Sequence, residues 1–370
     1  MLPFGNATHT PERAQPNPAP RPPAPLPMKS SRVTISHLAK TLDLSVCTVS
    51  KILNRSFNGF TYAADTIARV DALAQKLGYR PNSHARGLRT RQSGLVGFIL
   101  PTAQIALFGA LTDRLEMELR ARGYQVMIAH SRNDTGAERE LIAEFLARGI
   151  DGLVWIPASL KVVPEKSGLP PSLPVVILDR PGCTSAIPFV ATDNRESARA
   201  LARRIYDTGH RTVEVINAPA GDRAMSERLQ GIKDVFGQGM SVTNIANETE
   251  PARAATVGLF ENQSRPGLLF ALSEPLAIGA LSGLRDLHLR IPEDLSFAAF
   301  DDFPLASQWS PPVTVVRQEI DQLASAAAQL LVGRIKHPRK SFSSVRIPAS
   351  IEWRGSVGSA TGIPGTASPA

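Results

Sequence analysis

Cysteine is almost absent from this sequence: its 370 residues include only Cys47 and Cys183. Two cysteines cannot build a disulfide framework, so we expect a protein of a reducing compartment. The N-terminus has no compact apolar core behind a basic stretch, which argues against a secretory signal peptide. The uncharged stretch from Gln92 to Thr112 is broken at its centre by Pro101–Gln104, whereas a membrane-spanning helix needs roughly 20 predominantly apolar residues. These absences predict a cytoplasmic protein.

The sequence also lacks the common signatures of catalysis. It contains no glycine-rich dinucleotide motif after a strand, no phosphate-binding P-loop and no nucleophile elbow. The seven histidines are scattered, so no cluster of metal ligands is apparent. Asp301 and Asp302 are adjacent carboxylates, but neighbours on a strand point to opposite faces. We therefore predict a protein that is not an enzyme and needs no cofactor or metal, with an α/β enzyme as the least favoured alternative.

Positive charge is concentrated in one short segment. The chain has 41 Lys and Arg against 33 Asp and Glu, which gives a net charge of +8. Between Lys29 and Ser93 there are eleven basic residues and three acidic ones, so this segment alone accounts for the excess and the remainder is neutral. A basic domain attached to a neutral body is the electrostatic pattern of nucleic-acid binding.

Composition divides the chain into five parts. Residues 1–28 contain nine prolines and almost no apolar pattern, so we expect a disordered extension there. A helical head (29–80) and a short hinge helix with its linker (81–93) follow, and Pro81 is a suitable first residue for the hinge helix. The body covers residues 94–356, and residues 357–370 form a second disordered tail, rich in Gly, Ser, Thr and Pro.

The head has the apolar spacing of three helices. Thr34 is a suitable N-cap for the first helix and Ser45 for the second, with a break at Asp43–Leu44 between them. Two short helices joined by about three turn residues match the helix-turn-helix motif. A third helix begins near Asp65 and ends at Gly78. The residues expected to face the core are Ile35, Leu38, Ala39, Leu42, Val49, Ile52, Leu53, Ile67, Val70, Leu73, Ala74 and Leu77.

From Leu95 onward, predicted strands alternate with helical stretches such as Leu111–Arg122 and Ala137–Arg148. The alternation repeats after Asp193, which predicts two doubly wound lobes with parallel sheets. Ligands of such folds bind beyond the carboxyl ends of the strands, here in a cleft between the lobes. The predicted strands are Leu95–Leu100, Gln125–Ala129, Gly152–Ile156, Val175–Leu178, Val213–Asn217, Val242–Ile245, Leu268–Leu272 and Leu295–Phe300.

These motifs resemble the lactose-repressor (LacI) family of transcriptional regulators. In the head, the resemblance is carried by Val33–Lys40, Ser45–Asn54, Leu77–Asn82 and Ala85–Thr90. In the body, it is carried by Val176–Arg180, Thr192–Asn194, Gly209–Arg211 and Phe300–Asp302. The resemblance extends from Arg32 to Ser356. It implies an α + α/β protein in which a three-helix helix-turn-helix head and a hinge helix precede a periplasmic-binding-protein-like effector domain.

The resemblance also implies which residues contact DNA. Val46, Cys47 and Lys51 occupy the base-contacting positions of the helix that enters the major groove. Lys51 can donate to guanine, with a phosphate contact as the alternative, whereas Val46 and Cys47 offer apolar contact, for instance with a thymine methyl group. A redox-sensing role for Cys47 is a less favoured alternative. Leu88 resembles the family's minor-groove wedge, and the alternative is an exposed linker leucine. The expected contacts to the DNA backbone are Thr34, Thr48, Ser50 and Asn54.

In the body, the resemblance places Phe108 against a bound effector and Arg228 on one of its oxygen atoms. Asp301 would accept hydrogen bonds from the effector, and Ser273 would add one more. An aromatic face with convergent Arg and Asp suits a small polar molecule such as a sugar or sugar acid. The alternatives are core packing for Phe108 and loop capping for Asp301.

Several positions depart from the family pattern. Asp43 replaces the usual turn glycine, although Asp tolerates left-handed backbone geometry. Ala63 replaces an expected capping Ser or Thr before the third helix. In the cleft, Leu107 replaces a frequent aromatic residue and Glu274 replaces a common Asp. These departures leave the class of effector open.

The combined expectation is a homodimeric regulator, most often a repressor, that binds a pseudopalindromic double-stranded operator. Effector binding would change the angle between the two lobes and thereby the affinity for DNA. A non-specific architectural DNA-binding protein is the main alternative. It fits the charge distribution but leaves the cleft unexplained.

Overall fold

The computed structural model describes residues 33–55, 57, 59, 61–79, 92–158, 167–181, 187–218, 223–261 and 266–360. The chain divides into two compact units, residues 1–82 and 83–370. The predicted N-terminal extension, the predicted hinge helix with Leu88, and Cys183 lie outside the described residues.

Within its described residues, the first unit contains three helices: α1 (Ile35–Leu42), α2 (Val46–Leu53) and α3 (Ala64–Lys76). Both predicted N-caps form, because the side chains of Thr34 and Ser45 accept hydrogen bonds from the N–H groups of His37 and Thr48. Asp43 ends α1 in the left-handed conformation, with φ 56° and ψ 43°. The carboxylate residue thus takes the geometry that glycine usually supplies at this turn.

α3 follows Ala63, whose methyl group cannot cap the helix, and Gly78 comes after its end with φ 60°.

A small apolar core holds the three helices together. Four side chains, one or two from each helix, have no exposed surface: Leu38, Val49, Ile52 and Val70. All four were expected to face inward, and the predicted three-helix pattern is confirmed.

The second unit consists of two lobes, each built on a six-stranded sheet. The N-terminal lobe has the strand order β11-β5-β4-β3-β1-β2, and all its pairs are parallel. Its strands are β1 (Leu95–Leu100), β2 (Gln125–His130), β3 (Gly152–Trp155), β4 (Val175–Leu178), β5 (Phe189–Thr192) and β11 (Val345–Ile347). The C-terminal lobe has the order β12-β10-β9-β8-β6-β7, in which only the β10–β12 pair is antiparallel. Its strands are β6 (Val213–Asn217), β7 (Met240–Asn244), β8 (Leu268–Ala271), β9 (Ser296–Phe300), β10 (Thr314–Arg317) and β12 (Ser350–Glu352).

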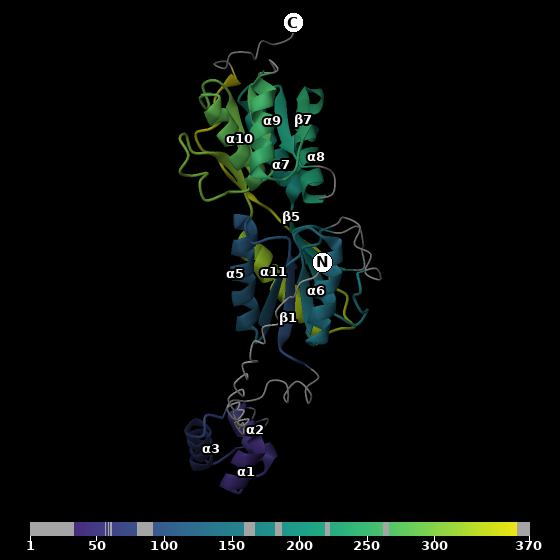
Figure 1. The fold of residues 1–370 in the computed structure, drawn as a ribbon, viewed down its shortest axis with the longest axis vertical. Coiled ribbons are helices and arrows are strands. Elements are labelled where there is room, and N and C mark those ends of the chain that lie inside the picture. The colour runs from purple at the N-terminus through teal and green to yellow at the C-terminus, as the bar shows by residue number, and fades with distance from the viewer. Residues whose placement is uncertain are drawn as a thin grey trace, which may run out of the picture. The chain divides into compact units, whose positions relative to one another are not determined.

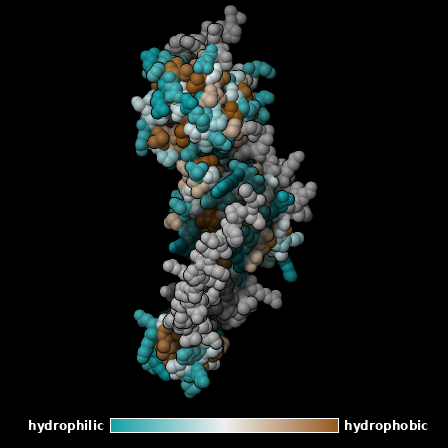
Figure 2. Space-filling model, viewed as in Figure 1, coloured by the Kyte–Doolittle hydropathy of each residue, from teal (hydrophilic) through white to brown (hydrophobic). Residues whose placement is uncertain are grey.

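Helices cover both faces of each sheet, as expected for a doubly wound fold. In the N-terminal lobe, α5 (Ala106–Ala121) and α11 (Ile320–Lys336) pack on one face and α6 (Thr135–Ala147) on the other (Figure 1). In the C-terminal lobe, α7 (Asn194–Asp207) packs on α8 (Arg223–Phe236), and α9 (Thr249–Glu261) packs on α10 (Glu274–Asp286). On the face of the molecule shown in Figure 2, apolar residues of this lobe are interspersed with polar ones. Within the described residues, no helix combines the length and apolar character that crossing a membrane requires.

The chain passes between the lobes three times. It leaves the N-terminal lobe after β5, returns after β10 to form α11 and β11, and crosses again to form β12. The eight predicted strands all form, with ends shifted by at most two residues. β5 was not predicted from the sequence. Nor were β10, α11, β11 and β12, the elements that make the second and third crossings.

The C-terminal tail begins later than expected. Residues 357–360 were assigned to a disordered tail, but they pack on the C-terminal lobe. The Gly358 N–H donates to Ser296 Oγ at 3.0 Å, and the Ala360 N–H donates to the carbonyl oxygen of Thr208 at 3.3 Å. This part of the predicted tail therefore belongs to the lobe.

Candidate DNA-binding surface and effector cleft

One side of α2 is exposed and carries the three residues expected to contact bases. Val46, in the first turn, is 45% exposed, which is unusual for a large apolar side chain in this protein. Cys47 beside it is a free, exposed thiol, and Lys51 lies one turn later and is half-buried. The opposite side of α2 presents Val49 and Ile52 to the core. The amphipathic helix therefore leaves its first turn open to a partner.

The four residues expected to contact the DNA backbone already take part in local hydrogen bonds. Thr34 Oγ1 accepts from the His37 N–H at 3.3 Å. The Thr48 hydroxyl lies 2.8 Å from Ser45 Oγ. Asn54 Nδ2 donates to the carbonyl oxygen of Ser50 at 2.7 Å and lies 3.4 Å from its hydroxyl. These contacts give each residue a structural role at a helix end, and whether they also meet phosphates stays a prediction.

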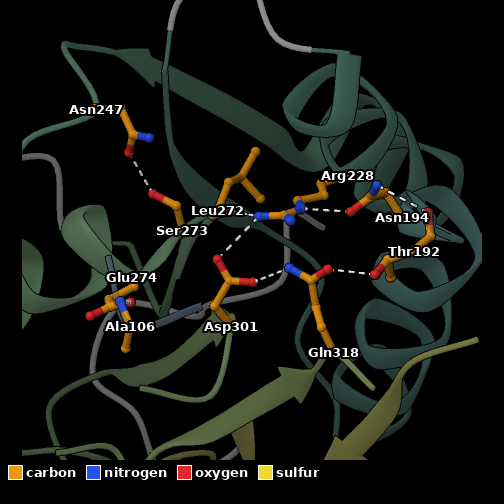
Figure 3. A network of polar contacts seen from close by, with 10 residues as sticks. All are labelled: Ala106, Thr192, Asn194, Arg228, Asn247, Leu272, Ser273, Glu274, Asp301 and Gln318. Atoms are coloured by element: carbon orange, nitrogen blue, oxygen red, sulfur yellow. Dashed lines mark hydrogen bonds and ion pairs between the residues drawn. The ribbon is translucent and has the colours of Figure 1, made fainter. Parts of the chain in front are cut away.

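In the second unit, Arg228 of α8 is the centre of a buried polar cluster (Figure 3). Only 3% of the residue is exposed. Its Nη1 donates to the carbonyl oxygen of Leu272 at 2.8 Å and lies 3.3 Å from Asp301 Oδ2. Its Cζ lies 3.8 Å from the centroid of the Phe300 ring, a cation–π contact. Arg228 and Asp301, two of the residues expected to bind the effector, are therefore brought together as an ion pair.

Hydrogen bonds connect this ion pair to the segments that cross between the lobes. Asp301 Oδ1 accepts from Gln318 Nε2 at 2.6 Å, and Gln318 Oε1 in turn accepts from the Thr192 hydroxyl. Arg228 Nε donates to Asn194 Oδ1 at 2.8 Å, and Asn194 Nδ2 donates to the Thr192 carbonyl oxygen at 3.1 Å. The five residues thus close a ring, in which Thr192 takes part through both its hydroxyl and its main-chain carbonyl group (Figure 3). Thr192 and Asn194 flank the first crossing and Gln318 lies on the second, so the ring joins the candidate effector site to both.

Ser273 and Glu274 lie at the start of α10, beside the ring. The Ser273 hydroxyl donates to Asn247 Oδ1 at 2.6 Å, and Ser273 is 3% exposed. Glu274 is 8% exposed, and its Oε2 accepts from the N–H of Ala106 in the other lobe at 2.8 Å. Burial raises the pKa of the Glu274 carboxyl, as does the nearby Asp301, whereas the backbone N–H groups of Ala106 and Leu107 lower it.

Two cavities between the lobes share Glu274 as a lining residue. The larger has a volume of about 570 Å³ and the smaller about 290 Å³. The larger is lined by Pro101, Thr102, Gln104, Ile105, Arg132, Asn133, Arg180, Asn247, Glu248, Thr249, Glu274, Pro275 and Ile278. The smaller is lined by Ala106, Leu107, Ala110, Glu274, Asp301, Asp302, Phe303, Pro304, Ser307, Arg317, Gln318 and Ile320. Both are large enough for a small polar ligand.

Phe108 lies in the first turn of α5, in the hydrophobic core of the N-terminal lobe, and is 3% exposed. The guanidinium carbon of Arg180 lies 6.0 Å from its ring centroid. The structure thus gives Phe108 a packing role, and its contact with an effector stays a prediction. Sequence reasoning missed Gln318 and Asn247 as members of the site. Neither has a local signal, because their partners lie 17 to 126 residues away along the chain.

The fold and the site together define a class of protein. A helix-turn-helix unit and a two-lobed body with a polar cleft between parallel sheets are combined in one chain. Residues 202–357 match the family model described as a periplasmic binding protein-like domain.

Relatives and solved structures agree with this class. The chain is similar to the ribose operon repressor of Halalkalibacterium halodurans, with 28% identity over 87% of this chain and 96% of the relative. The fold resembles that of the lac repressor dimer bound to operator and the anti-inducer ONPF, at 18% identity and a TM-score of 0.76 over 88% of this chain and 99% of that chain. It also resembles the transcriptional regulator CelR in complex with cellobiose, at 25% identity and a TM-score of 0.63 over 88% and 100% of the two chains.

Over most of its length, the chain is similar to DNA-binding transcriptional repressors of the lactose-repressor family. The resemblance seen in the head and body motifs is confirmed.

Proposed function

We propose that this protein is a cytoplasmic repressor of the bacterial nucleoid whose affinity for operator DNA is set by a sugar-type effector. The observation that carries the proposal is the ring of hydrogen bonds that joins Arg228 and Asp301 to both crossing segments. A ligand that replaces the hydrogen-bond partners of Arg228 or Asp301 acts directly on the crossing segments, about which the lobes turn. Coupling of about 1–3 kcal/mol between such a site and DNA binding is typical of allosteric proteins.

The proposed DNA contacts are divided between specificity and positioning. Val46 and Cys47 are exposed in the first turn of α2 and would meet apolar base edges such as a thymine methyl group, while Lys51 donates to guanine. Thr34, Thr48, Ser50 and Asn54 position the helix on the phosphates. Two copies of the chain read the half-sites of a pseudopalindrome. The hinge segment (81–93) connects each head to its body and inserts Leu88 into the minor groove.

The effector is proposed to be a sugar or a sugar acid, bound by Arg228, Asp301 and Ser273. Asp301 accepts from hydroxyl groups, and Ser273 can accept from or donate to them. The guanidinium group of Arg228 donates to a hydroxyl, carbonyl or carboxylate oxygen. CelR was solved with cellobiose. A sugar has both polar and apolar surfaces, and these match cavities lined by both polar and apolar residues. Phe108 is the proposed effector contact from the N-terminal lobe, and the alternative is that it serves only to pack the core of that lobe.

Selection of duplexes from a random DNA library tests the proposal, with full-length protein at near-physiological salt. We expect an enriched pseudopalindrome with a flexible central base step. Genes next to matching sites would indicate candidate effectors, and these small molecules should alter the protein's affinity for the operator. Salt-sensitive binding with a specificity ratio near one, with and without added metabolite pools, would instead favour the non-specific architectural alternative.

Two variants test the assigned DNA contacts on the selected operator. Lys51→Ala should cost about 1–3 kcal/mol at one base position and relax specificity there. The matched control is Lys40→Ala, which removes an exposed lysine of α1 and should weaken all sequences about equally. Leu88→Ala should weaken specific binding by about tenfold or more, because the wedge that kinks the duplex is lost. Unchanged operator affinity in a titration would remove Leu88 from the proposal.

A further inference from the structure

Glu274 makes a hydrogen bond between the two lobes. It is the first residue of α10 in the C-terminal lobe, and its carboxylate accepts the N–H of Ala106, the first residue of α5 in the N-terminal lobe, at 2.8 Å. The two residues are 168 positions apart in sequence. Figure 3 shows the carboxylate and Ala106 facing each other beside the ring.

α5 receives from this contact the N-cap that its own sequence does not provide. The residue before it is Ile105, whose aliphatic side chain cannot accept a hydrogen bond. The first N–H groups of a helix have no partner within the helix, and the helix dipole favours a negative charge next to them. A carboxylate from the opposite lobe meets both needs, and it does so only while the lobes are close enough for Glu274 to reach.

The hydrogen bond between Glu274 and Ala106 lies in an enclosed place, which strengthens it. Glu274 is 8% exposed, so water competes little for the hydrogen bond, and hydrogen bonds to charged groups are among the stronger ones in proteins. The residue also lines both cavities between the lobes. A ligand in either cavity would therefore lie beside the contact.

We propose that Glu274 is a cross-lobe latch, which caps α5 from the C-terminal lobe and holds the two lobes together beside the effector cleft. The latch itself depends only on this geometry, and its regulatory consequence rests on the proposed function. An effector in either cavity would then act on an opening between the lobes that Glu274 limits. The length of the Glu274 side chain is required for the contact. An Asp at this position would keep the negative charge, but it is one methylene shorter and would not reach the Ala106 N–H.

Hydrogen–deuterium exchange of the full-length, effector-free protein tests the latch. The readout is the exchange rate of a peptide covering 103–111, divided by the rate of a reference peptide covering β9 and measured in the same sample. Glu274→Asp keeps the negative charge at the start of α10, Glu274→Gln keeps an oxygen acceptor at full length, and Glu274→Ala removes both. Glu248→Gln is the matched control, since Glu248 lines the same larger cavity but is exposed.

We expect Glu274→Asp and Glu274→Ala to raise the exchange ratio at the start of α5 by about tenfold or more. Glu274→Gln should give a smaller increase and Glu248→Gln no change. A Glu274→Asp variant with the wild-type ratio would overturn the latch, because charge alone would then suffice. A ratio that stays constant because both peptides exchange faster would also overturn it, since the residue would then only support overall stability. Operator selection with the wild-type protein is an independent measurement, so a failure of the proposed function is distinguishable from a failure of the latch.

Discussion

The two lobes share one topology but differ in what they bring to the cleft. The orders β2-β1-β3-β4-β5 and β7-β6-β8-β9-β10 are the same doubly wound arrangement. The C-terminal lobe supplies Arg228, Asp301, Ser273 and Glu274, all less than 9% exposed. Facing them, the N-terminal lobe presents the backbone N–H of Ala106 and the polar residues of the larger cavity, while Phe108 is buried in the core of that lobe.

This difference suggests a division of labour between lobes of similar fold. The buried charges of the C-terminal lobe are connected to each other and to the crossings, so they are held in one arrangement before a ligand arrives. Preorganised polar groups lose little entropy on binding. The N-terminal lobe then acts mainly as the surface that closes on the ligand, with the start of α5 as its point of contact.

The largest effect is expected from Arg228→Ala in the C-terminal lobe. The substitution leaves Asp301 buried without its guanidinium partner and frees the Asn194 side chain and the Leu272 carbonyl group. Breaking a buried ion pair in this way costs about 3–5 kcal/mol. We expect a loss of that size in the free energy of unfolding, measured by urea denaturation, and no response to effector.

Arg199→Ala is the matched control for that measurement. Arg199 pairs with Glu196 on the surface of α7, and the two side chains are 47% and 56% exposed. Pairs of this kind contribute about 0–1 kcal/mol. If the two variants lost similar stability, the buried ring would not be the organising feature of the C-terminal lobe.

The second prediction concerns Phe108, the aromatic residue of the N-terminal lobe. Because Phe108 is 3% exposed within the lobe core, Phe108→Leu should lower the free energy of unfolding by about 1 kcal/mol. Denaturation of the variant without ligand gives this value. A separate titration with effector then measures stacking: a tenfold loss of affinity in the folded variant would establish it. Unchanged stability would contradict the packing role.

The helix-turn-helix unit was predictable from sequence because its signals are local. Apolar spacing, the caps Thr34 and Ser45, and the left-handed Asp43 all act within a few residues of each other. Eight strands of the body were predictable for the same reason, as short apolar runs between helical patterns.

The organisation of the cleft could not be predicted in this way. The hydrogen bond from Thr192 to Gln318 joins residues 126 positions apart, and the bond from Ala106 to Glu274 joins residues 168 apart. No periodicity relates such pairs. The return of α11 and β11 to the N-terminal lobe, after a full C-terminal lobe, likewise leaves no local pattern. Family resemblance named Arg228 and Asp301, but only the fold shows that they are bonded to the crossings.

The smallest effect is expected at Glu138, a buried carboxylate of the N-terminal lobe. Glu138 is 3% exposed, and its Oε1 accepts from Trp155 Nε1 at 2.9 Å and from the Ala158 N–H at 2.7 Å. Burial raises the pKa of this carboxyl, although these two donors and Arg180 oppose the shift. The folded protein therefore keeps the proton to a higher pH than the unfolded chain does.

Glu138→Gln isolates that contribution to stability. As pH rises from the ordinary carboxyl range through the raised pKa, the unfolded wild-type chain loses its proton first, so this residue's contribution to stability falls. The amide of Gln can accept both hydrogen bonds and does not ionise. We expect the two proteins to have similar Tm values under acidic conditions, and the variant to become the more stable one as pH approaches neutral. Thermal melts of both proteins across that pH range provide the measurement. A variant that is less stable at neutral pH would show that the ionised carboxylate stabilises this lobe, as buried charges do in the other.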